Sequence, residues 1–171
     1  AAPATLAPLG TANGYQHLYV EGAGSAASGN TKFSWMNERR FYTVTAITDA
    51  SDELMFTRIG ANDPDFNLRR EAGFMLRRDN TANTLFVSTV ESHGSYNPVS
   101  ELALNTESNI ATLSVAYDDE NYTAIAIESV SGGTSLFIVC NTDASAASSH
   151  ELTVDGTVHA WTGPYLYLEA P

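Results

Sequence analysis

The sequence is poor in positive charge. Its 171 residues include only eight Lys and Arg against twenty Asp and Glu, which gives a formal net charge of -12 at pH 7. From Asp79 to Pro171 there are twelve acidic residues and no Lys or Arg. Nucleic acids and anionic membranes bind to clustered positive charge. We therefore expect neither a nucleic acid nor a membrane as a partner, and an anionic ligand is compatible only with the first half of the chain.

Long apolar runs and cysteine pairs are also missing. The run "LFIVC" at 136–140 is far shorter than the roughly 20 residues that cross a bilayer, and no signal sequence opens the chain. The single cysteine, Cys140, excludes an internal disulfide and is expected to be a small buried residue. Residues 1–14, "AAPATLAPLGTANG", are expected to be a linker or the boundary of an excised segment.

Short segments of alternating apolar and polar residues fill the rest of the chain. They are rich in Val, Ile, Thr, Phe and Tyr, and no helical apolar stripe persists for ten residues. Turn residues separate the segments, with hairpin signals at Gly132–Gly133 and Asp155–Gly156. The pattern predicts about twelve short strands in an all-β fold, an antiparallel β-sandwich or two-sheet stack that forms one domain over residues 15–171. Both faces of residues 41–48 contain apolar side chains, which predicts a strand covered on both sides.

Motifs for catalysis and for metal binding are not recognisable. The four histidines stand alone in the sequence, so their spacing does not support a metal site. No G-x-S-x-G motif or phosphate loop occurs. Twenty acidic residues make any carboxylate pair uninformative about glycoside hydrolysis. We predict neither a cofactor nor a catalytic residue in this chain.

Two histidines have neighbours that suit a sugar site. His93 in "VESHGSYNP" ends an apolar segment directly before a glycine, and binding residues are common where a strand meets a turn. His17 in "GYQHLYVEG" alternates with Tyr15 and Tyr19, so these three side chains share one strand face. Such rings stack on sugars, although an aromatic core face is the commoner arrangement.

The arginines are concentrated in one stretch. Five of the eight basic residues lie between Phe56 and Asp79. They can form an internal framework of ion pairs, for which Asp63, Asp65 and Glu71 are available. Alternatively, some of them recognise a carboxylate at a cleft, because the planar guanidinium offers two parallel donors. The two interpretations are compatible, and both stay open at this point.

Four blocks of the sequence resemble a known family, in the same order along the chain. The blocks are "PLGTANGYQHLYVEG", "FSWMNERRFYTVT", "DELMFTRIGANDPDFNLRREAGFMLRR" and "TLFVSTVESHGSYNPVSE". They resemble the C-terminal β-sheet region of the heparinase II/III-like oligoalginate lyases of polysaccharide lyase family seventeen. The resemblance covers residues 8–101 strongly, and the remaining residues are compatible with closing strands.

The resemblance implies a fold and a parent enzyme for this chain. Family members combine an (α/α) toroid with a large antiparallel β-sheet region and cleave alginate by β-elimination. Their catalytic residues lie mainly on the toroid, and their zinc ligands lie in the first part of the sheet region. This sequence matches neither part, so no family catalyst can be assigned to a numbered residue here.

The combined prediction is a non-catalytic β-sandwich module of an alginate lyase-like enzyme. It is expected to support the parent enzyme, to bind alginate or oligoalginate and to have the lyase toroid as its partner. The expected ligand-binding residues are Tyr15, His17, Trp35, Arg69, Arg77 and His93. Because alginate lies outside cells, a secreted or periplasmic location is expected. Two alternatives are a fragment of a split or clipped lyase that acts together with a missing toroid, and a purely structural domain.

Overall fold

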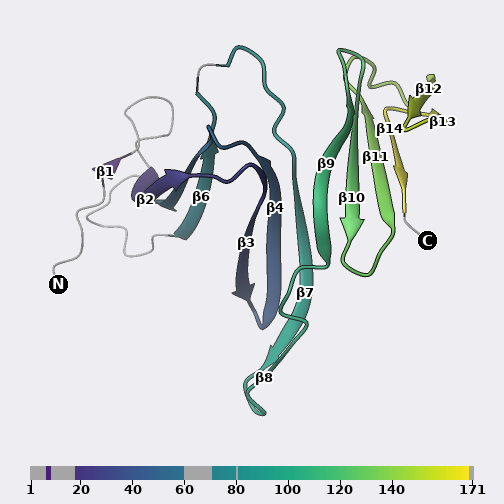
Figure 1. The fold of residues 1–171 in the computed structure, drawn as a ribbon. Helices are drawn as coiled ribbons and strands as arrows, with labels where there is room; N and C mark the ends of the chain where they lie inside the picture. The colour runs from purple at the N-terminus through teal and green to yellow at the C-terminus, as the bar shows by residue number, and fades with distance from the viewer. Residues whose placement is uncertain (1–6, 9–17, 60–70, 80, 170–171) are drawn as a thin grey trace. The chain divides into compact units, whose positions relative to one another are not determined.

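Within the part of the chain described by the computed structural model, every regular element is a β-strand (Figure 1). Residues 7–8, 18–59, 71–79 and 81–169 are described. The strands are β1 (Ala7–Pro8), β2 (Leu18–Ser25), β3 (Gly29–Asn37), β4 (Arg40–Thr48), β5 (Glu53–Ile59), β6 (Glu71–Arg77), β7 (Ser88–Asn97), β8 (Leu102–Leu104), β9 (Ile110–Asp118), β10 (Tyr122–Ser129), β11 (Thr134–Cys140), β12 (Ser149–Val154), β13 (Thr157–Thr162) and β14 (Tyr165–Leu168). All described pairings are antiparallel. The predicted all-β, antiparallel fold is confirmed.

The chain divides into two compact units, and we treat the described residues of each unit separately. The first comprises Ala1–Gly29 and Thr48–Leu85, and the second comprises Asn30–Ile47 and Phe86–Pro171. The single domain expected over residues 15–171 stays a prediction. No helix among the described residues is long and apolar enough to cross a membrane.

The first unit contains a four-stranded sheet in the order β1-β2-β5-β6. Strands β2 and β5 are neighbours in this sheet although β3 and β4 lie between them in the sequence. Their register runs from Leu18 opposite Ile59 to Ser25 opposite Glu53, with a bulge between Val20 and Gly22. The β2–β5 pairing thus joins segments that are distant in sequence.

The second unit contains the sheet β3-β4-β7-β8. In Figure 1, β3, β4 and β7 run side by side. Strand β4 is buried on both faces, since Thr43 and Thr45 on one face and Val44 and Ala46 on the other are at most 7% exposed. This confirms the prediction that residues 41–48 are covered on both sides.

The main apolar core lies among the C-terminal strands of the second unit. These strands form the sheet β14-β11-β10-β9 and the hairpin β12-β13. The core cluster consists of Ala124, Ile138, Cys140, Leu152, Val154 and Trp161. Its members alternate along their strands, so one face of each strand supplies the core. Cys140 is buried as predicted, and burial raises the pKa of its thiol.

Both predicted hairpin turns are present. Val154 pairs with Thr157 around Asp155 and Gly156, whose φ angles are 49° and 79°. Glu128 pairs with Thr134 on either side of the turn that contains Gly132 and Gly133. Positive φ angles are those that two-residue hairpin turns require, and they explain the Asp-Gly signal.

Candidate functional site

Only half of the predicted ligand-binding residues lie in the described part of the chain. The others, Tyr15, His17 and Arg69, lie outside it. Trp35 is in β3, Arg77 ends β6, and His93 is in β7. The ligand-binding role of all six residues stays a prediction. The three described residues have very different surroundings.

Arg77 is engaged with acidic side chains of its own sheet. Its guanidinium pairs with the carboxylate of Glu53, the residue opposite it on β5. Its Nε atom also lies 3.7 Å from Oδ1 of Asp79. The Arg77 side chain is 45% exposed, so solvent screens both interactions. A ligand carboxylate at Arg77 would compete with Glu53.

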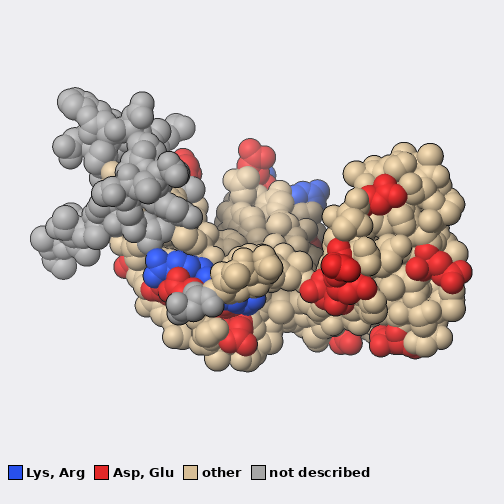
Figure 2. All heavy atoms as spheres, turned by 90° about the horizontal axis from the view of Figure 1, so that it is seen from above, with Lys and Arg blue, Asp and Glu red and all other residues tan. Residues whose placement is uncertain are grey.

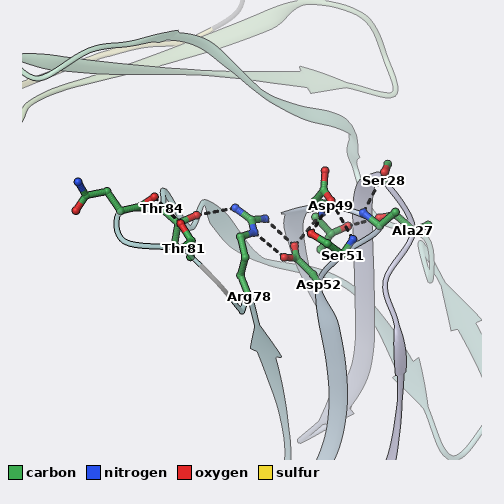
Figure 3. Close-up of polar contacts among 11 residues, drawn as sticks. Ala27, Ser28, Asp49, Ser51, Asp52, Arg78, Thr81 and Thr84 are labelled. Carbon is green, nitrogen blue, oxygen red and sulfur yellow. Dashed lines mark hydrogen bonds and ion pairs between the residues drawn. The ribbon is translucent and has the colours of Figure 1, made fainter.

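Arg78 forms a bidentate ion pair with Asp52 at the turn between β4 and β5 (Figure 3). Its Nε and Nη2 atoms each lie 2.6 Å from a carboxylate oxygen of Asp52, and its Nη1 donates to Oγ1 of Thr84 at 2.8 Å. The Asp52 side chain is fully buried, whereas that of Arg78 is 20% exposed. Two parallel hydrogen bonds from a planar guanidinium are the strongest form of such a pair.

Asp52 also organises the turn around it. Its Oδ2 accepts a hydrogen bond from the N–H of Asp49 at 2.8 Å, and its backbone carbonyl accepts one from the N–H of Ala26 at 2.9 Å. The hydrogen bonds from Arg78 lower the pKa of the Asp52 carboxyl group, although burial alone would raise it. The pair therefore joins β6 to the β4–β5 turn with an ionised carboxylate.

The ion-pair framework expected of the arginine stretch is thus formed by those of its arginines that the structure describes. Arg58 completes it, with Nε 2.9 Å from Oε1 of Glu21 on the neighbouring strand. The acidic partners differ from those expected: they are Glu21, Asp52, Glu53 and Asp79. Of the expected acids, Asp63 and Asp65 lie outside the described residues. Strand pairing, which the local sequence does not contain, brings Glu21, Asp52 and Glu53 to these arginines.

His93 lies within a strand and not at a strand end as expected. Strand β7 continues to Asn97, because Gly94 adopts a φ of 55° and forms a bulge between the pairs Phe41–His93 and Arg40–Ser95. The side chain is 5% exposed, and its ring stacks on Phe41 with centroids 6.2 Å apart. This burial does not suit the direct ligand contact that the sequence suggested.

Hydrogen bonds at both ring nitrogens connect His93 to neighbouring strands. Its Nδ1 lies 2.9 Å from the carbonyl oxygen of Asn105, and its Nε2 lies 2.8 Å from Oγ1 of Thr43. Thr43 is in turn 2.7 Å from the hydroxyl of Ser34. A carbonyl only accepts, so Nδ1 carries a proton and donates to Asn105, while Nε2 and the Thr43 hydroxyl share the second hydrogen bond. The chain of contacts connects β3, β4, β7 and the end of β8.

Trp35 has the exposure that sugar stacking needs. The residue is 42% exposed, and its ring is stacked on Tyr42 of the adjacent strand β4, with centroids 5.6 Å apart and an interplanar angle of 17°. An aromatic ring that is packed on one side and open on the other keeps its orientation without losing its accessible surface. Trp35 is therefore the described residue that best fits its predicted role.

A hollow not expected from the sequence lies at the end of the same sheet. It has a volume of about 430 Å³ and is lined by Glu38, Arg39, Arg40, Gly94, Ser95, Tyr96, Asn97 and Pro98. These residues come from the β3–β4 turn and from the last part of β7. A hydrogen bond from the N–H of Tyr96 to the carbonyl of Arg39, at 2.9 Å, joins the two segments. The two adjacent arginines make this a candidate anion site.

The β3–β4 turn that carries these arginines has an unusual backbone. Glu38 and Arg39 have φ angles of 47° and 68°, in the left-handed region that Asn and Gly normally occupy in such turns. Neither residue type signals a tight turn, so this position did not stand out in the sequence. The available signal was the pair of basic residues between the strand patterns "KFSWMN" and "FYTVT".

Charge elsewhere on the described surface is predominantly negative. Figure 2 shows Asp and Glu and no Lys or Arg over β9 to β14, as the composition after Asp79 requires. Among the described residues, no three His, Cys, Asp or Glu side chains are grouped to hold a metal ion. The candidate binding features are therefore the hollow and the Trp35–Tyr42 stack, both in the sheet β3-β4-β7-β8.

Comparisons with known proteins identify relatives that align with nearly the whole chain. No protein-family model matches the chain. It is 33% identical over 167 residues, or 98% of its length, to a protein named alginate lyase from Stenotrophomonas maltophilia. It is 27% identical over 158 residues, or 91% of its length, to a protein named exo-oligoalginate lyase from Saccharophagus degradans. The chain is related to a region of the alginate lyases. The predicted alginate-lyase relationship is thereby confirmed.

The alginate-lyase-related chain corresponds to only part of these relatives. It spans 22% of the Stenotrophomonas protein and 21% of the Saccharophagus protein. The names of these relatives thus describe proteins of which this chain matches about a fifth.

Proposed function

We propose that this chain is a non-catalytic β-sheet module of an alginate lyase-like enzyme, and that it binds alginate or oligoalginate. The observation that carries the proposal is the coverage: the relatives match nearly the whole chain, yet the chain spans about a fifth of each of them. A segment of that kind supplies part of a lyase, and the catalytic groups come from the rest of the parent protein.

Two features of the sheet β3-β4-β7-β8 support a binding role. The exposed face of Trp35 offers a stacking surface for a pyranose ring. The hollow beside Arg39 and Arg40 offers guanidinium groups, which match the carboxylate that every uronate residue carries. A uronate offers a ring face to the first kind of group and a carboxylate to the second.

Titration of the purified chain with defined alginate oligosaccharides, followed by calorimetry, tests this proposal. Saturable heat with oligosaccharides and none with a neutral glucan of equal length is the expected result. Absence of heat at roughly millimolar sugar, the weak end of specific binding, would refute the binding role and favour a purely structural module.

We also propose a catalytic toroid as the partner of this module and a secreted or periplasmic location, where alginate is available. The toroid can belong to the same polypeptide or, as in a split lyase, to a separate one. An absorbance assay for unsaturated uronate, run on the chain alone and on the intact natural protein, distinguishes these cases. Product formed by the chain alone would contradict the non-catalytic assignment.

A further inference from the structure

We propose that the hollow at the β3–β4 turn is a subsite for the carboxylate of an acidic saccharide, held by Arg39 and Arg40. The identity of the ligand as a uronate rests on the proposed function, whereas the anion site rests on the hollow itself. Its volume of about 430 Å³ lies within the range of about 300–1,000 Å³ that is typical of small-molecule sites.

Within the part of the chain that the structure describes, Arg39 and Arg40 differ from the other cations in having no interaction partner for their side chains. Lys32 donates to the carbonyl of Ile110, and the remaining described arginines all form ion pairs. Within the described part of the chain, neither the Arg39 nor the Arg40 guanidinium has a carboxylate within 4.0 Å or a hydrogen-bond acceptor. Their donors are thus available to an anion, in a molecule whose net charge is -12.

The other lining residues suit the remainder of a sugar. Oδ1 of Asn97 accepts from the N–H groups of Val99 and Ser100 at 2.9 and 3.4 Å, which leaves its amide nitrogen as a donor for a hydroxyl group. Tyr96 is half-buried and contributes both a ring and a phenol group. Charged donors for a carboxylate next to neutral groups for hydroxyls are the combination that a uronate needs.

The backbone around the hollow retains strained conformations. Glu38 and Arg39 occupy the left-handed region in the turn, and each has a conformational penalty there that Asn or Gly would avoid. On the opposite wall, Gly94 permits a close approach, since an added Cβ atom would overlap with the carbonyl oxygen of Asn105. Strain that persists at the rim of a charged hollow is typical of a functional site.

The strained turn provides a matched pair of variants. Arg39→Gly and Glu38→Asn each introduce a residue type that adopts the left-handed backbone conformation with less strain. Each should therefore raise the melting temperature by about 2–4 °C. Their effects on affinity should be opposite. Loss of the Arg39 guanidinium should weaken binding of a mannuronate trisaccharide about tenfold. Loss of the Glu38 carboxylate should tighten binding about threefold, because its negative charge repels the carboxylates of the ligand.

Glu120→Asn is the control for general electrostatics. It removes the same charge as Glu38→Asn from another exposed turn, between β9 and β10, and should change the affinity less. If wild-type protein binds the trisaccharide and both turn variants leave the affinity unaltered, the subsite assignment is overturned while the proposed function stands.

A direct measurement separates the anion site from the alginate ligand. The Nε–Hε resonances of Arg39 and Arg40 are followed by NMR during addition of sodium glucuronate, with glucose as the neutral control. Shifts with glucuronate support the subsite even if alginate oligosaccharides do not bind, an outcome that would refute only the proposed function. Unchanged resonances with both glucuronate and the trisaccharide would overturn the subsite.

Discussion

Arg77 and Arg78 are neighbours in the sequence but stand in different environments. Strand alternation directs them to opposite sides, so Arg77 meets Glu53 at the surface while Arg78 meets the fully buried Asp52. Solvent screening leaves little net free energy in the first pair. The second pair contains a buried carboxylate, whose charge would have no counter-charge if Arg78 were removed.

Substitution of these two arginines should therefore have unequal effects on stability. Arg78→Ala should lower the free energy of unfolding by about 3 kcal/mol, because it leaves the charge of Asp52 buried. Arg77→Ala should change it by less than about 1 kcal/mol. Urea denaturation of both variants measures the difference, and equal losses would contradict the assignment of Arg78 as the structural member of the pair.

Asp52 should also make the protein sensitive to acid. Its pKa is lowered in the folded state from the ordinary value of 3.8, mainly by the hydrogen bonds from Arg78. A lowered folded-state pKa contributes stability that is present above the unfolded-state value and is lost as the pH falls through the folded-state value. Thermal unfolding between about pH 4 and pH 2 tests this. Asp52→Asn should be less stable than the wild type at the upper pH, and its stability should fall less as the pH is lowered. Parallel losses would show that Asp52 does not contribute to the acid response.

At the scale of elements, alternation and turn chemistry made most of the β-strands predictable. The Asp155–Gly156 hairpin is the clearest case, since the residue types that signal the turn also adopt its positive φ angles. The pairing of β2 with β5 was not predictable, because it depends on contacts between segments separated by another hairpin. The hollow was missed for a related reason: Glu38 and Arg39 adopt turn conformations that their side chains do not favour.

The β7–β8 arrangement depends on Gly94. Its φ of 55° lies in the left-handed region, where any residue with a side chain is strained. A Cβ atom at this position would also overlap with the backbone carbonyl oxygens of Leu104 and Asn105. The backbone of one segment would have to move to admit a side chain.

We expect Gly94→Ala to destabilise the protein by about 3 kcal/mol or more and to weaken uronate binding, since Gly94 also lines the hollow. Gly22→Ala is the matched control, because no atom lies within 4 Å of its added Cβ. It should change stability by about 0.5 kcal/mol at most. Chemical denaturation compares the two, and a tolerated Gly94→Ala would contradict the close approach of β7 and β8.

At the scale of the whole molecule, the local charge of the hollow opposes the charge of the protein. The net charge of -12 repels an anionic sugar at long range, whereas Arg39 and Arg40 attract its carboxylate at short range. The Debye length is about 10 Å at 0.1 M salt, so distant acidic groups are already largely screened there. Between about 0.1 and 0.5 M salt, we expect the affinity for alginate oligosaccharides to fall as the remaining attraction is screened.

The decisive measurement is calorimetric titration of the purified chain with alginate oligosaccharides at those two salt concentrations. A carbohydrate-binding module of an alginate lyase-like enzyme should give saturable heat at low salt and a weaker affinity at high salt. No heat at either concentration would contradict a binding role. Saturable binding with a salt-independent affinity would contradict the assignment of arginine–carboxylate pairing as its source.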